Sequence, residues 1–134
     1  MSRFAISHKA LTAVSTLVIL MLTYYAWDAS ASVRGEVVAR YDIARGHYQE
    51  LTYGLPVPQR PTYAHVLKER YGIEVHAVSG CIVWPSLIAY VRGYNKVSMA
   101  AANRRWRRDV FDESWHEAGR IWRLNHPEAL VSGR

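Results

Sequence analysis

An uncharged, apolar run from Ala10 to Trp27 follows a short basic head that contains Arg3 and Lys9. At about 1.5 Å per helical residue the run is about 27 Å long, which is just enough to cross the hydrocarbon core of a bilayer. Its last residues carry aromatic rings of the kind that lie at the level of the lipid headgroups, namely Tyr24, Tyr25 and Trp27. The sequence therefore predicts a helix that meets a membrane.

The same segment also fits a secretory signal, because it leads into Ala29-Ser30-Ala31, an A-x-A cleavage pattern. Cleavage after Ala31 would release a secreted chain that begins at Ser32. The apolar core of a typical signal peptide is about 7 to 15 residues long, and this run is longer, so we favour an uncleaved single-pass anchor. We expect the N-terminus in the cytoplasm and the rest of the chain on the periplasmic or extracellular side.

The segment from Ser32 to Arg45 places apolar residues at helical spacing, so it predicts a helical stem after the anchor. The residues of this stripe are Val33, Val37, Val38, Tyr41 and Ala44. We divide the chain into a head and anchor at 1–31, the stem at 32–45, a small α/β domain at 46–126 and a tail at 127–134. A single domain of this length buries only a modest core.

Two short segments with alternating polarity flank a helical pattern in the first half of the domain. His47 to Tyr53 and Ile73 to Val78 predict strands, and Tyr63 to Tyr71 predicts the helix between them. Gly72 follows this helix at the position where a left-handed residue often ends a helix. A strand, a helix and a strand in succession favour a right-handed β-α-β unit with parallel strands.

Two apolar stripes at helical spacing occupy the C-terminal third, and a break is expected between Asn103 and Trp106. The first stripe, after Pro85, is Leu87, Tyr90, Val91, Tyr94, Val97 and Ala101, and the second is Val110, Phe111, Trp115, Ala118, Ile121 and Trp122. A two-stranded sheet is too small to be stable alone, so we expect these two helices to pack against the β-α-β unit. The predicted fold class is a small α/β (α+β) domain behind a transmembrane helix and stem.

Five short segments, spread over most of the chain after the apolar run, together carry a resemblance to known proteins. They are Arg45-Gly46-His47-Tyr48, Tyr53-Gly54-Leu55-Pro56, Glu69-Arg70-Tyr71-Gly72-Ile73-Glu74, Gly80-Cys81 and Gly93-Tyr94-Asn95. In these segments the chain resembles a family of small bacterial membrane and envelope proteins of unknown function, over about Ala39 to Ala118. The resemblance implies a place in the bacterial envelope, and it brings no fold, activity or catalytic residue.

Cys81 is the only cysteine, and it is the residue whose side chain is most capable of chemical reaction. It follows a predicted strand and precedes a predicted helix, and the free N–H groups at a helix N-terminus lower the pKa of a thiol. A nucleophilic thiol needs a base, for which His47 and His76 are the candidates. A free cysteine is more often a small buried apolar side chain, and the neighbouring Ile82-Val83 favours that interpretation.

The segment Arg104-Arg105-Trp106-Arg107-Arg108 gathers four guanidinium groups around an indole ring. Such a cluster can bind anionic lipid headgroups, or nucleic acid that stacks on the ring, although a membrane anchor argues against nucleic acid. Acidic residues at helical ion-pair spacing favour a solvated, self-neutralised face instead. The expected pairs are Arg105 with Asp109, Arg108 with Asp112, and Glu117 with Arg120.

The sequence contains no motif that assigns an activity. Its six histidines lack metal-binding spacing and a second cysteine is absent, so we predict neither a metal site nor a cofactor. We favour an interaction or structural module, anchored in the bilayer and binding a protein partner in the envelope, over catalysis. The alternatives are a thiol-dependent enzyme or redox protein that uses Cys81, and an anionic-lipid-binding module at 104–108. No pattern specifies an oligomeric state.

Overall fold

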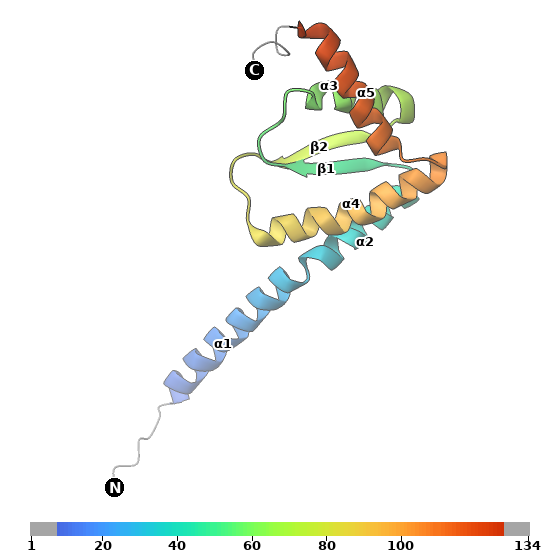
Figure 1. Cartoon of the computed structure of the whole chain (residues 1–134). Helices are drawn as coiled ribbons and strands as arrows, with labels where there is room; N and C mark the ends of the chain where they lie inside the picture. Colours follow the sequence, from blue (N-terminus) through green and yellow to red (C-terminus); the bar gives the residue numbers. More distant parts are fainter. Residues whose placement is uncertain (1–7, 128–134) are drawn as a thin grey trace.

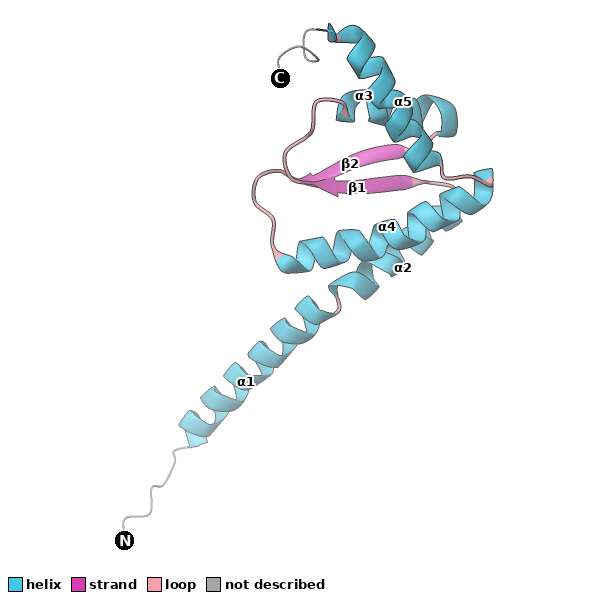
Figure 2. Cartoon of the chain, viewed as in Figure 1, coloured by secondary structure: helices cyan, strands magenta, loops and turns pink. Residues whose placement is uncertain are grey.

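The computed structural model describes residues 8–127, so Arg3 and almost all of the expected tail lie outside the described residues. The chain is mixed α/β and mostly helical (Figures 1 and 2). In order, its elements are α1 (His8–Ala29), α2 (Ala31–Ala44), β1 (Gln49–Tyr53), α3 (Arg60–Tyr71), β2 (Glu74–Ser79), α4 (Pro85–Trp106) and α5 (Val110–Asn125).

The apolar N-terminal segment forms the single long helix α1, which projects away from the rest of the molecule (Figure 1). All of its side chains lie outside the protein core, because none of its 22 residues is buried. By length and composition it is able to cross a membrane. The helix expected over Ala10 to Trp27 is therefore confirmed, and it extends two residues further at each end.

The two strands form a parallel pair in which Gln49 lies opposite Glu74 and Leu51 opposite His76. The parallel pairing expected from the sequence is confirmed, although β1 begins at Gln49 rather than at His47. Between the strands, α3 ends at Gly72, whose φ of 65° places it in the left-handed region. This is the predicted cap, and glycine adopts it without the strain that a Cβ would bring.

The helices cover both faces of the sheet, with α2 and α4 on one face and α3 and α5 on the other (Figure 1). One core cluster joins Leu51 of β1 to Ala39, Val91 and Tyr94. The second cluster, between α3, α5 and the end of α4, consists of Tyr63, Leu67, Ile73, Ala102, Val110, Phe111 and Ala118. The predicted pair of helices is confirmed, but the break lies after Trp106 rather than between Asn103 and Trp106, since Arg107 ends α4 with a φ of 56°.

Polar side chains of α4 satisfy the free edge of β1. The Asn95 amide accepts a hydrogen bond from the N–H of Leu51 (2.8 Å) and donates one to its carbonyl (2.7 Å). The Ser98 hydroxyl donates to the carbonyl of Gln49 at 2.5 Å. An edge strand exposes unpaired backbone groups, so these two side chains take the place that a third strand would occupy.

The helix expected at 32–45 is confirmed as α2, but it does not stand apart from the domain, because it packs along α4 (Figure 1). Its buried face consists of the small residues Ala31, Gly35 and Ala39. Most of the apolar stripe on which the prediction rested remains exposed, including Val33, Val37, Val38 and Tyr41. The folded domain therefore begins at Ala31 rather than near Gly46.

Candidate functional site

Cys81 is exposed in the loop between β2 and α4. The residue that caps α4 is Trp84, so three residues separate the thiol from the first turn of the helix. The sequence placed Cys81 just before this helix, as either a buried side chain or an activated thiolate. The exposure corrects the first interpretation.

The two candidate bases lie elsewhere. His47 precedes β1, and because the strands are parallel it lies at the edge opposite the end of β2, after which Cys81 follows. The six residues of β2 alone span about 20 Å. The His76 ring lies 3.3 Å from a carboxylate oxygen of Glu74, and this contact together with Lys68 lowers the pKa of Glu74. The structure thus does not bring Cys81 together with His47, and it pairs His76 with a carboxylate.

The arginine cluster lies at the end of α4 that points away from α1 (Figure 1). Trp106 packs edge-on against Tyr48 and Tyr71, with ring centroids 5.4 and 5.5 Å apart, so its ring belongs to the core and is no stacking platform. The guanidinium of Arg105 lies 5.2 Å from the centre of the Tyr48 ring. The four arginines at 104, 105, 107 and 108 are exposed at this corner.

Two of the expected ion pairs, Arg105 with Asp109 and Arg108 with Asp112, require a continuous helix across the break between α4 and α5. Neither pair forms in the structure. Arg108 pairs instead with Glu113, at 3.3 Å. The third expected pair, Glu117 with Arg120, is also replaced. Glu117 pairs instead with Arg70 of α3, and this ion pair joins α5 to α3. Asp109 and Asp112 are thereby left free of the arginine cluster, and both line a pocket on the other side of the break.

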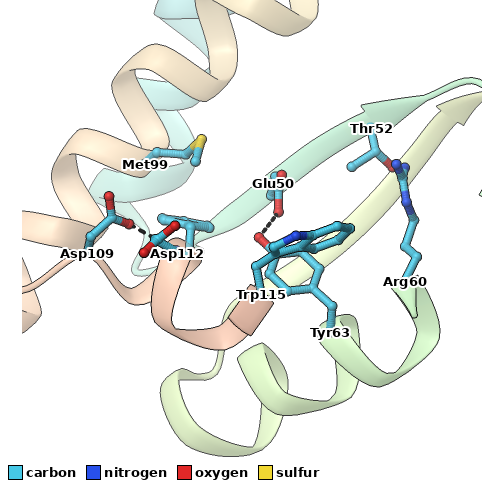
Figure 3. A pocket seen from close by; sticks show the side chains of 9 residues that line it. Glu50, Thr52, Arg60, Tyr63, Met99, Asp109, Asp112 and Trp115 are labelled. Atoms are coloured by element: carbon cyan, nitrogen blue, oxygen red, sulfur yellow. Dashed lines mark hydrogen bonds between the residues drawn. The ribbon is translucent and has the colours of Figure 1, made fainter. Parts of the chain in front are cut away.

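This hollow, here called the Glu50 pocket, has a volume of about 400 Å³ and opens to the surface between β1, α3 and α5 (Figure 3). Its walls combine three carboxylates, one arginine and three aromatic rings. The lining residues are Glu50, Thr52, Arg60, Tyr63, Met99, Asp109, Phe111, Asp112 and Trp115.

Local structure explains how these side chains come together. Side chains alternate along a strand, so Leu51 faces the core with α4 while Glu50 and Thr52 point to the opposite face, towards α3 and α5. Asp109 caps α5 by accepting a hydrogen bond from the N–H of Asp112 at 3.1 Å. Trp115, one turn further along α5, meets the Tyr63 ring edge-on at 5.2 Å between centroids (Figure 3).

Glu50 is the centre of the pocket's electrostatics. The Tyr63 hydroxyl donates a hydrogen bond to its carboxylate at 2.6 Å (Figure 3). Burial raises the pKa of Glu50, and the hydrogen bond from Tyr63 and the charge of Arg60 oppose that rise. Burial and the neighbouring Glu50 carboxylate raise the pKa of Tyr63 far above its ordinary range, so the phenol stays protonated and remains a donor.

The pocket carries three carboxylates against one guanidinium, so it presents a net negative charge beside an exposed indole ring. This combination suits a cationic group, which carboxylates attract and which the face of a tryptophan ring also stabilises. Over residues 8–127 the structure contains no group of three or more histidine, cysteine or acidic side chains arranged to hold a metal ion.

Sequence reasoning did not find this pocket. It assigned Tyr63, Phe111 and Trp115 to apolar stripes, and it counted the two aspartates as partners of the arginine cluster. The available signal was Glu50, an acidic residue in the middle of a predicted strand whose neighbour Leu51 is apolar. An acidic side chain on a covered sheet face indicates either a partner or a site.

No protein-family model, no curated protein and no solved structure matches this chain. The geometry of the described residues therefore carries the functional argument.

Proposed function

We propose that this chain is a single-pass membrane protein of the bacterial envelope whose α/β domain binds a partner through the Glu50 pocket. In this proposal α1 crosses the bilayer with its N-terminus in the cytoplasm, and the domain lies on the outer side. The partner presents a cationic side chain or amine to Glu50, Asp109 and Asp112. The protein acts as an interaction module, and its pocket recognises charge rather than catalysing a reaction.

The membrane arm of the proposal is supported by the exposure of α1. Leu17, Ile19 and Leu20 are each about 60% exposed, and the other large apolar side chains of the helix are exposed to a similar degree. Such a long apolar surface is costly in water and favourable in hydrocarbon. The rings of Tyr24, Tyr25 and Trp27 lie at the end nearest the domain, as expected where a helix leaves the bilayer.

The binding arm depends on one observation, the half-buried carboxylate of Glu50. Its hydrogen-bond donor is a neutral hydroxyl, and over residues 8–127 no salt bridge neutralises it. Arg60 supplies a counter-charge without direct ion-pair contact. A partly desolvated carboxylate that lacks a direct ion pair costs stability, and a bound cation offsets that cost. Sites of this kind are typical of binding positions, where stability is traded for function.

The test is a titration of the full chain, in lipid nanodiscs, with three N-acetylated and C-amidated peptides that differ in one side chain: Ala-Lys-Ala, Ala-Arg-Ala and Ala-Gln-Ala. NMR of the tryptophan indole N–H groups reports binding, and Trp115→Phe identifies the signal of Trp115. We expect a basic peptide to shift this signal and the glutamine peptide to leave it unchanged. Glu50→Gln should weaken binding by about tenfold or more, which corresponds to about 1.4 kcal/mol or more.

Glu113→Gln is the matched control, because it makes the same change on α5 outside the pocket. It should bind the basic peptides as the native chain does. The proposal is wrong if the basic peptides leave the Trp115 signal unshifted, or if Glu50→Gln and Glu113→Gln bind equally well.

A further inference from the structure

The loop between β2 and α4 carries large apolar side chains into solvent. Ile82 is 76% exposed and Trp84 is 51% exposed, with the exposed Cys81 beside them. Scattered exposed apolar residues are ordinary, but an isoleucine and a tryptophan together at the tip of a short loop form a patch. A tryptophan in such a place is typical of a surface that touches a membrane interface.

The loop and the end of α1 line the same hollow. Trp84 lines a shallow hollow together with Trp27 and Arg34, and the first turns of α4 complete its wall. The Arg34 guanidinium lies 3.8 Å from the centre of the Trp27 ring and donates a hydrogen bond to the Trp27 carbonyl at 2.9 Å. These contacts join α1 to α2, and the shared hollow places Trp84 beside the end of α1 that is nearest the domain (Figure 1).

The depth of this end follows from the length of the helix. If the apolar run ending at Trp27 fills the hydrocarbon core, the Trp27 ring lies at the level of the headgroups. Trp84 shares a hollow with Trp27 and therefore lies at nearly the same depth. Arg34 lies at that level as well, where a guanidinium pairs with lipid phosphate.

We infer that the loop at 80–84 inserts Ile82 and Trp84 into the headgroup region of the bilayer that α1 crosses. This inference rests on the proposed membrane anchor. The domain then contacts the membrane at two points, the end of α1 and this loop, and is not attached through α1 alone. The occupant of the apolar loop is the lipid surface, because the loop is continuous with the surface of the membrane helix.

The single cysteine provides the measurement. Cys81 of the full chain is labelled with a nitroxide, the chain is reconstituted in phosphatidylcholine vesicles containing phosphatidylglycerol, and flotation verifies its insertion. Electron paramagnetic resonance then compares collisions of the label with oxygen, which concentrates in lipid, and with a water-soluble nickel chelate. The reference is the same label on Arg104→Cys in a Cys81→Ser background, at the distal end of α4.

We expect the ratio of oxygen to nickel accessibility to be several-fold higher at Cys81 than at position 104. The double substitution Ile82→Glu and Trp84→Glu should reduce the ratio at Cys81 to the value at position 104, because it withdraws the loop from the lipid. Leu124→Glu is the control, since Leu124 is also an exposed apolar residue but lies near the end of α5. This variant should leave the ratio unchanged.

The outcomes separate this inference from the anchor on which it rests. A chain that floats with the vesicles while its Cys81 label behaves like the label at position 104 contradicts the inference and leaves the anchor intact. A label that both reagents fail to reach contradicts it too, because protein rather than lipid then covers the loop. A chain that does not float removes the anchor and the inference together.

Discussion

At the scale of single residues, Glu50 carries the functional interpretation. Its place on β1 turns it towards α3 and α5, where Tyr63 supplies a hydrogen bond and Asp109 and Asp112 add negative charge. The protein gains no ion pair in return for burying this carboxylate. The proposed cationic partner would account for an acidic side chain at this covered position, since it would supply the direct ion pair that Arg60 does not make.

The first prediction concerns pH. Burial raises the pKa of Glu50 in the folded state above the ordinary value of 4.5, so the folded protein holds this proton more tightly than the unfolded chain does. Well below pH 4.5 both states are protonated and the group has no effect. As pH rises from there through the folded pKa, Glu50 lowers the free energy of unfolding.

Glu50→Gln removes this dependence and keeps an oxygen that accepts the Tyr63 hydrogen bond. We therefore expect its free energy of unfolding, relative to that of the native chain, to increase as pH rises from 4 to neutral, as measured by urea unfolding in detergent. Other titrating groups are common to both chains and cancel in the difference. A difference that is independent of pH, or that decreases towards neutral pH, would contradict the burial of this carboxylate.

At the scale of elements, the contact between α2 and α4 decides where the domain begins. A Cβ on Gly93 would lie 2.1 Å from the carbonyl oxygen of Ser32, and one on Gly35 would lie 2.2 Å from the carbonyl oxygen of Tyr90. Both distances are far below van der Waals contact, so glycine is required for the two backbones to approach this closely. The Tyr94 hydroxyl also donates a hydrogen bond to Asp42, at 2.8 Å, between the same two helices.

Gly93→Ala should therefore force α2 and α4 apart and lower the free energy of unfolding by about 2 to 3 kcal/mol. Gly119→Ala in α5 is the control, because its new Cβ would meet only side-chain atoms, at 3.4 and 3.5 Å. There the gain in helix propensity should leave stability equal or slightly higher. Urea unfolding followed by tryptophan fluorescence measures both, and equal effects of the two substitutions would show that α2 and α4 are not closely packed.

The sequence predicted the helices and strands better than it predicted their contacts. Apolar spacing located α1, α4 and α5, and Gly72 marked the end of α3. The packing of the stem against the domain was not predicted because periodicity emphasises large side chains, whereas α2 packs through Ala31, Gly35 and Ala39. Small residues permit close helix contact but carry little hydrophobic signal. The role of Asn95 at the edge of β1 was not predicted for a different reason: it depends on a contact across 44 residues of sequence.

At the scale of the whole molecule, the elements form layers along the direction of α1. The apolar helix α1 leads into the α2 and α4 layer, the sheet follows, and α3 and α5 lie furthest from α1 (Figure 1). The Glu50 pocket opens among the outer elements, whereas the loop at 80–84 lies beside the end of α1. In the proposed function, this arrangement separates the surface that would face the bilayer from the surface that would bind a partner.

The arginine cluster illustrates what the sequence alone was unable to place. Its composition predicted lipid contact as one alternative, but α4 is 22 residues long, or about 33 Å, and the cluster lies at its distal end. The residues near the end of α1 are instead Trp27, Arg34 and Trp84. The run of arginines is evident in the sequence. The end of the domain at which it lies depends on the direction of α4, which the sequence does not give.

The most direct test of this account asks whether α1 stays in the membrane with the domain attached. Cells expressing the chain are fractionated, the membranes are washed with alkaline carbonate, and mass spectrometry identifies the N-terminal peptides of the retained protein. We predict that the protein remains in the washed membranes and still contains the apolar segment from Ala10 to Trp27. A soluble protein that begins at Ser32 would contradict the account, because α1 would then be a signal that is removed.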